Sequence, residues 1–149
     1  TYTDCRGNGM KKRIVILAAA LCMLMGMTAL ADNDINVYIN ENKVEFSDRT
    51  PMKIDGELFL PLRSIFEAMG TEVFWTGETS TVICAGADVK AILQIGNDIL
   101  FKDNEQFKMK SAPVIVDDRT MVTADAVENV FGLTAAYDSK NGIIRFEVK

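Results

Sequence analysis

The feature that most constrains the fold of this chain is a pattern of residues that occurs twice. The block Pro51–Gly70 is echoed by Pro113–Gly132 at a constant offset, since 113 − 51 and 132 − 70 both equal 62. Proline, aspartate and glycine recur at matched places, and apolar residues match apolar residues between them. The two blocks share no recognisable set of catalytic residues, so the pattern indicates duplicated architecture rather than a duplicated active site. We therefore expect a structural or binding role.

The region before this pattern predicts a targeting segment. Residues 10–31 have the three parts of a secretory signal peptide, namely a basic start, an apolar run and a small-x-small cleavage pattern. These parts are Lys11–Arg13, Ile14 to about Met27, and Ala29–Ala31. We expect cleavage before Asp32, and we interpret residues 1–9 as upstream sequence outside the natural start. The apolar run is short, so no stable membrane span is expected after cleavage, and a retained anchor is the alternative.

The charge of the remaining chain narrows the classes of partner. Residues 32–149 number 149 − 31 = 118 and carry 12 basic and 20 acidic side chains, a net charge of 12 − 20 = −8. An acidic surface repels nucleic acid and anionic membranes, whereas a cationic partner or a neutral polymer is compatible with it. This length supports one compact domain with its own core.

The residue types needed for common chemistry are largely missing. The chain has no histidine, which excludes Ser-His and Cys-His nucleophile systems and histidine-based zinc or copper sites. Cys84 is the single cysteine after residue 31, so it forms no internal disulfide, and its apolar surroundings predict a buried strand residue. Asp117-Asp118 is read as an acidic β-turn in preference to a calcium loop or an acid/base pair. The sequence thus predicts no cofactor, no metal and no enzymatic activity.

Periodicity predicts an α+β fold built from two tandem repeats, at about residues 35–85 and 91–149. Each repeat reads as a β-hairpin, a short strand, a short helix and a second β-hairpin. Residues 85–89 are the expected junction, without a long linker. A unit of about 55 residues is marginal alone, so the two are expected to share or abut a core.

The two short helices are predicted from spacing and from their ends. The first has Pro61 at the first helical position and Gly70 just past its end. Its apolar face consists of Leu62, Ile65, Phe66 and Met69. The second is expected to be capped by Thr123, with Asp125 in its first turn, and to end at Gly132. Its apolar face consists of Val127, Val130 and Phe131.

Three residues are the candidate ligand contacts: Trp75, Tyr137 and Arg63. Trp75 is the sole tryptophan, and next to a polar turn it could stack on a sugar ring, although its strand neighbours Val73 and Phe74 favour a core position. For Arg63 a structural role is favoured, either a pair with Glu67 four positions later or a hydrogen bond to a loop carbonyl. In the second repeat Tyr137 corresponds to Trp75, and Asp125 corresponds to Arg63, so a ligand role at that helix start is not expected twice.

Several of these strings resemble a known family. They are Asn36-Val-Tyr-Ile-Asn40, Lys43-Val-Glu-Phe46, Leu60-Pro-Leu-Arg63, Glu67-Ala-Met-Gly70 and Trp75. They resemble the copper amine oxidase N-terminal-like domain, also called the stalk-domain family of secreted bacterial proteins, and the half from Ala91 resembles it with weaker motifs. In amine oxidases this domain is a non-catalytic stalk, separate from the copper domain whose metal is held by histidines. The resemblance therefore implies the appendage without the enzyme.

Three functions from different classes follow as hypotheses. The leading one is a secreted, non-catalytic stalk or interaction module of the cell envelope, associated with the cell surface or wall. The alternative is a polysaccharide- or peptide-binding protein of the cell wall. The third is a small carboxylate hydrolase, which requires two facing acids, one with a raised pKa. The expected partner is an envelope protein or a cell-wall polymer, and exposed strand edges would allow a weak homodimer.

Overall fold

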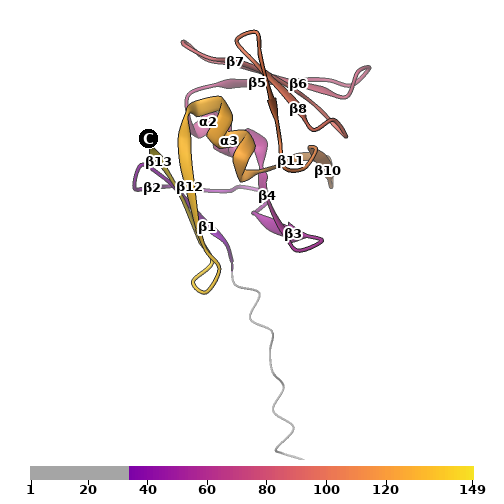
Figure 1. Ribbon diagram of the computed structural model, residues 1–149. Coiled ribbons are helices and arrows are strands. Elements are labelled where there is room, and N and C mark those ends of the chain that lie inside the picture. The colour runs from indigo at the N-terminus through magenta and orange to yellow at the C-terminus, as the bar shows by residue number, and fades with distance from the viewer. Residues whose placement is uncertain (1–33) are drawn as a thin grey trace, which may run out of the picture. The chain divides into compact units, whose positions relative to one another are not determined.

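The computed structural model describes residues 34–149, so the predicted upstream segment 1–9, the predicted signal peptide 10–31 and the predicted first mature residue Asp32 lie outside this range. The described part is α+β, which confirms the predicted fold class, and its strands form three sheets (Figure 1). Neither of its helices has the length and apolar character needed to cross a membrane. The elements are β1 (Asn36–Ile39), β2 (Asn42–Lys43), β3 (Met52–Ile54), β4 (Glu57–Pro61), α2 (Leu62–Ala68), β5 (Glu72–Thr76), β6 (Thr81–Ala85), β7 (Lys90–Gln94), β8 (Ile99–Lys102), β9 (Glu105–Lys108), β10 (Val114–Val116), β11 (Arg119–Thr123), α3 (Ala124–Phe131), β12 (Leu133–Asp138) and β13 (Ile143–Val148).

The 62-residue offset recurs in the bounds of these elements. β10 begins 114 − 52 = 62 positions after β3, β11 begins 119 − 57 = 62 positions after β4, and α3 begins 124 − 62 = 62 positions after α2. The two matched hairpins form sheet B, in the order β10-β11-β4-β3. β4 and β11 pair antiparallel in its centre, and Leu60 lies opposite Val122, its counterpart at the 62-residue offset. The duplication that this suggests stays a prediction.

The two halves are joined more closely than their sequences indicate. In sheet A, with the order β12-β13-β1-β2, the first strand pairs parallel with the last one. Sheet C, with the order β5-β6-β7-β8-β9, crosses the expected junction because β6 pairs antiparallel with β7. The connection at residues 86–89 is therefore a turn within one sheet. Because β1 and β13 are about 100 residues apart in the chain, no local pattern could predict their pairing.

One hydrophobic core contains residues from both halves, as expected for repeats that share a core. Leu62, Ile65 and Phe66 of α2 are fully buried, which confirms the predicted apolar face. Phe66 meets Phe131 of α3 edge-on, with ring centroids 4.9 Å apart and an interplanar angle of 69°. The contact joins the matched helices directly.

The ends of the helices follow the prediction with two corrections. Gly70 and Gly132 have φ values of +80° and +66°, the left-handed conformation that glycine adopts at low cost after a helix. Pro61 is the residue before α2 rather than its first residue, since it still pairs in β4. Thr123 occupies the N-cap position of α3, but its side chain caps no backbone N–H because its hydroxyl donates to the carboxylate of Asp125.

The predicted acidic turn at Asp117-Asp118 is confirmed. It joins β10 to β11, and both residues have positive φ, 45° and 61°. Two successive positive φ values define the type I′ turn, whose twist matches that of antiparallel strands. Both carboxylates are therefore placed by turn geometry at a hairpin tip.

Candidate binding site

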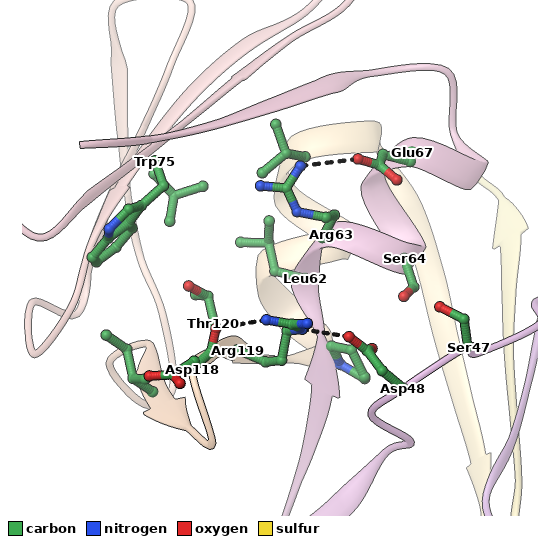
Figure 2. A pocket seen from close by; sticks show the side chains of 14 residues that line it. Ser47, Asp48, Leu62, Arg63, Ser64, Glu67, Trp75, Asp118, Arg119 and Thr120 are labelled. Atoms are coloured by element: carbon green, nitrogen blue, oxygen red, sulfur yellow. Dashed lines mark hydrogen bonds and ion pairs between the residues drawn. The ribbon is translucent and has the colours of Figure 1, made fainter. Parts of the chain in front are cut away.

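A pocket of about 520 Å³ lies where sheet B, sheet C and the start of α2 meet (Figure 2). Helix α2 contributes its first turns, β5 contributes two side chains, and the β10–β11 hairpin closes the opposite side. The lining residues are Ser47, Asp48, Pro61, Leu62, Arg63, Ser64, Glu67, Val73, Trp75, Val82, Ile115, Asp118, Arg119 and Thr120. We call it the Trp75 pocket. It brings together two of the three predicted contacts, Trp75 and Arg63.

Trp75 is 44% exposed, so its interpretation as a core residue is wrong. The reason is its strand: β5 is the edge of sheet C, and only β6 pairs with it. On β6 the residue opposite Trp75 is Val82, which is buried and also lines the pocket. The indole therefore covers one end of the core and leaves part of its surface to solvent. Ile115 of β10, 46% exposed, adds a second apolar side chain to the same pocket.

Both arginines of the pocket are paired with carboxylates that also line it (Figure 2). Arg63 Nη1 donates to Glu67 Oε1 at 3.2 Å, which confirms the predicted pair. Arg119 Nε donates to Asp48 Oδ2 at 2.5 Å. This bond, followed by one from the backbone N–H of Arg49, holds the pKa of Asp48 below its ordinary value. The pocket thus offers two ion pairs and the carboxylate of Asp118 as hydrogen-bonding groups, beside an aromatic ring and an aliphatic side chain.

Tyr137 lies elsewhere, in a second pocket of about 360 Å³. Its lining residues are Lys53, Gly56, Glu57, Leu58, Lys110, Thr123, Ala124, Asp125, Glu128, Ala135, Tyr137 and Ile144. All but Glu128 stand 62 positions from a residue of the Trp75 pocket: Tyr137 corresponds to Trp75, and Lys53 corresponds to Ile115. We call it the Tyr137 pocket. The two pockets occupy corresponding places around the matched hairpins.

The two pockets differ where a ligand would bind. The Asp48–Arg119 pair has its counterpart in Lys110–Glu57, with Nζ and Oε1 3.1 Å apart and the charges exchanged. Glu57 also accepts a hydrogen bond from the Ser111 hydroxyl, the main reason that its pKa is lowered. The Lys53 ammonium lies 5.6 Å from the centroid of the Tyr137 ring and occupies one face of it. The Trp75 pocket instead has an isoleucine at this place, so it is the better candidate for an aromatic contact with a ligand.

Sequence reasoning missed Asp48, Ile115 and Arg119. They come from a loop and from the β10–β11 hairpin, and they reach Trp75 only because β11 pairs with β4 across the two halves. The one available signal was the 62-residue offset, which matches Ile115 to Lys53 and Arg119 to Glu57.

The thiol and the carboxyl groups of the described residues bear on the hydrolase and metal-site hypotheses. Cys84 is free and buried on β6, as the sequence predicted. Desolvation raises the pKa of its thiol to about 12. Among residues 34–149, no three Cys, Asp or Glu side chains gather closely enough to hold a metal ion. The carboxyl groups with a shifted pKa, Asp48, Glu57 and Asp138, are all shifted downward. A general acid needs the opposite shift, so this geometry does not favour the hydrolase hypothesis.

Comparison with known protein families identifies the family of this chain. The family model of the copper amine oxidase N-terminal domain matches residues 38–146, so the match includes both pockets and most of all three sheets. The chain therefore belongs to this family, whose domain is a non-catalytic appendage. A search of curated proteins found no match.

Proposed function

We propose that this chain is a secreted, non-catalytic interaction module of the bacterial cell envelope, of the stalk type. Membership of the copper amine oxidase N-terminal domain family supports a stalk-like module. The acidic balance, −8 over residues 32–149, suits a partner that is cationic or neutral. In this role the β-sheets supply a rigid body, and binding surfaces on it hold the partner.

The Trp75 pocket favours one form of this function, binding of a cell-wall polysaccharide. The observation that carries it is the 44% exposure of Trp75 within a pocket lined by paired charges. A sugar ring has an apolar face that stacks on an indole and hydroxyl groups that exchange hydrogen bonds with carboxylates and guanidinium groups. Because Arg63 and Arg119 are each neutralised by a carboxylate, the pocket suits a neutral saccharide better than a strongly charged ligand.

Fluorescence tests this function directly, since Trp75 is the only tryptophan. We expect neutral glycan fragments of the cell wall to quench or shift its emission in a saturable way. The Arg119→Ala variant removes one pocket contact and should weaken binding about tenfold, the usual cost of a charge-assisted hydrogen bond. Tyr137→Phe is the matched control in the Tyr137 pocket and should bind as the parent does. An emission spectrum unchanged by glycans, and altered by wall peptides instead, would replace the polysaccharide with a peptide ligand.

The broader stalk function has its own experiment. The chain, immobilised, is incubated with envelope fractions of its source cell, and the retained material is identified. Fractionation of the same cells with an antibody shows where the chain resides. We expect it in the wall or the culture medium, and its recovery in the cytosol would contradict the proposal whatever the glycan titration shows.

A further inference from the structure

A row of apolar side chains crosses the outer face of sheet C. Along β6 and β7, burial alternates: Val82, Cys84, Ala91 and Leu93 are in the core, and the residues between them point to the opposite face. On that outer face four side chains lie in register on neighbouring strands. They are Phe74 on β5, Ile83 on β6, Ile92 on β7 and Phe101 on β8. We call them the apolar row; Figure 1 shows the strands that carry it.

The side chains of the apolar row are partly exposed to solvent. Phe74 is 51% exposed and Phe101 is 40% exposed, whereas Ile83 and Ile92 are half-buried between them. The corresponding row of sheet A is interrupted by a charged side chain. Ala136 and Arg145 stand 62 positions after Phe74 and Ile83, and Arg145 lies over the Tyr38 ring with its guanidinium carbon 4.8 Å from the centroid. A contiguous apolar strip on one face only is typical of an interaction surface.

The order of residues in the apolar row points to a second copy of this chain as the occupant. Read across the strands, the row is Phe-Ile-Ile-Phe, the same in both directions. A two-fold axis parallel to the strands, passing between β6 and β7, places each phenylalanine opposite a phenylalanine and each isoleucine opposite an isoleucine. Such self-complementarity is what an isologous interface requires.

The charges beside the apolar row fit the same axis. Glu72 lies two residues from Phe74 on β5, and Lys90 lies two residues from Ile92 on β7, both on the outer face. Ala85 of β6 lies between them in register. Both are exposed, and neither has an ion-pair partner within residues 34–149. The two-fold axis places Lys90 of one copy one strand spacing, about 4.8 Å, to the side of Glu72 of the other. The rotation thus produces two equivalent opposite-charge contacts.

We propose that the outer face of sheet C is a homodimer interface, formed by the apolar row and flanked by Glu72–Lys90 contacts between copies. The row spans three strand spacings, about 14 Å, so the interface belongs to the small and weak class. We expect a dissociation constant of about 10 µM to 1 mM. The interface uses a face of the sheet and leaves the Trp75 pocket open, since Trp75 and Phe74 point to opposite sides of β5.

Sedimentation velocity of the purified chain over a range of concentrations, up to about 1 mM, tests this interface. We expect concentration-dependent dimers, and Phe101→Lys should weaken association at least tenfold by placing a charge opposite Phe74 of the other copy. Ile115→Lys is the matched control, because it changes an equally exposed apolar residue on sheet B. It should leave association unchanged. A parent chain that stays monomeric, or one whose association both variants reduce equally, would overturn the proposal.

Charge exchange distinguishes a specific dimer from general adhesion of apolar surface. Glu72→Lys and Lys90→Glu should each weaken association several-fold, because each brings like charges together, and the double variant should restore it. Both side chains are exposed, so the melting temperature of each variant should match that of the parent. A double variant as weak as the single ones would show that these residues do not face each other across a two-fold axis.

Discussion

Phe66→Ala tests whether the two halves fold as one unit. Phe66 is fully buried on α2, and its ring is the main aromatic contact of Phe131 on α3. Truncation of a buried phenylalanine to alanine costs about 3–5 kcal/mol, because apolar contacts are lost and a cavity remains. A domain of 149 − 33 = 116 described residues has a free energy of unfolding of about 6–17 kcal/mol. The substitution should therefore remove roughly a fifth to four fifths of the stability of the whole chain.

Guanidinium denaturation followed by far-UV circular dichroism and by Trp75 fluorescence measures this loss. We expect one transition with coincident midpoints for the two probes, moved to lower denaturant by about 1 M in the variant. Phe74→Ala makes the same chemical change at a side chain that is 51% exposed, and it should cost less than about 1 kcal/mol. In the cycle with Phe131→Ala, the edge-on ring pair should contribute a coupling of about 0.5–1.5 kcal/mol.

Two results would refute this reasoning. Two separate transitions, of which Phe66→Ala moves only one, would show that the halves unfold independently in spite of their common core. A cost as small as that of Phe74→Ala would show that Phe66 does not occupy the buried position between α2 and α3.

Three further predictions concern a close contact, a thiol and a carboxyl group. Gly86→Ala should destabilise the chain by about 1–3 kcal/mol, because a Cβ there would lie 2.8 Å from Thr71 Cγ2. Thermal melting should show a lower midpoint. An unchanged midpoint would mean that the Thr71 side chain moves aside. Cys84, buried and with a thiol pKa of about 12, should react with a thiol reagent only as fast as the chain unfolds, and rapid labelling at neutral pH would contradict its burial. The Arg119 hydrogen bond lowers the pKa of Asp48 in the folded state. The stability that this bond contributes is therefore present above the unfolded pKa of about 3.8, and it is lost as the pH falls through the pKa of the folded state. Asp48→Asn should therefore flatten the fall in stability below about pH 4, measured by denaturation at several pH values, and an unchanged profile would show that this bond contributes nothing measurable.

The features that the sequence predicted well are those set by interactions between residues close together in the chain. The helix faces, the glycines that end the helices, the acidic turn and the Arg63–Glu67 pair all depend on residues a few positions apart. The absence of histidine from the sequence favoured a binding role over catalysis, and that role stays a prediction. These elements follow from periodicity and turn preference.

The site required information that no window of sequence holds. Trp75 has apolar neighbours, as a core residue would, and only the position of β5 at the edge of sheet C exposes it. The opposite side of its pocket comes from β10 and β11, about 40 residues later, through the pairing of β11 with β4. Likewise, the closure of sheet A by β1 and β13 joins the two ends of the described chain. Such long-range pairings decide which side chains meet.

The comparison between corresponding positions shows how one framework carries two kinds of surface. The residues that hold the matched hairpins together are apolar in both halves, as Leu60 and Val122 are, because both lie in the same core. The residues that face solvent differ in kind: Ile115 beside Trp75 corresponds to Lys53 over Tyr137, and Ile83 corresponds to Arg145. Lys53 and Arg145 each lie over an aromatic ring. Their counterparts Ile115 and Ile83 are apolar, and each lies near an exposed aromatic side chain. Because packing constrains these outer positions little, the apolar residues near Trp75 and on sheet C are consistent with the ligand and the dimer proposed for them.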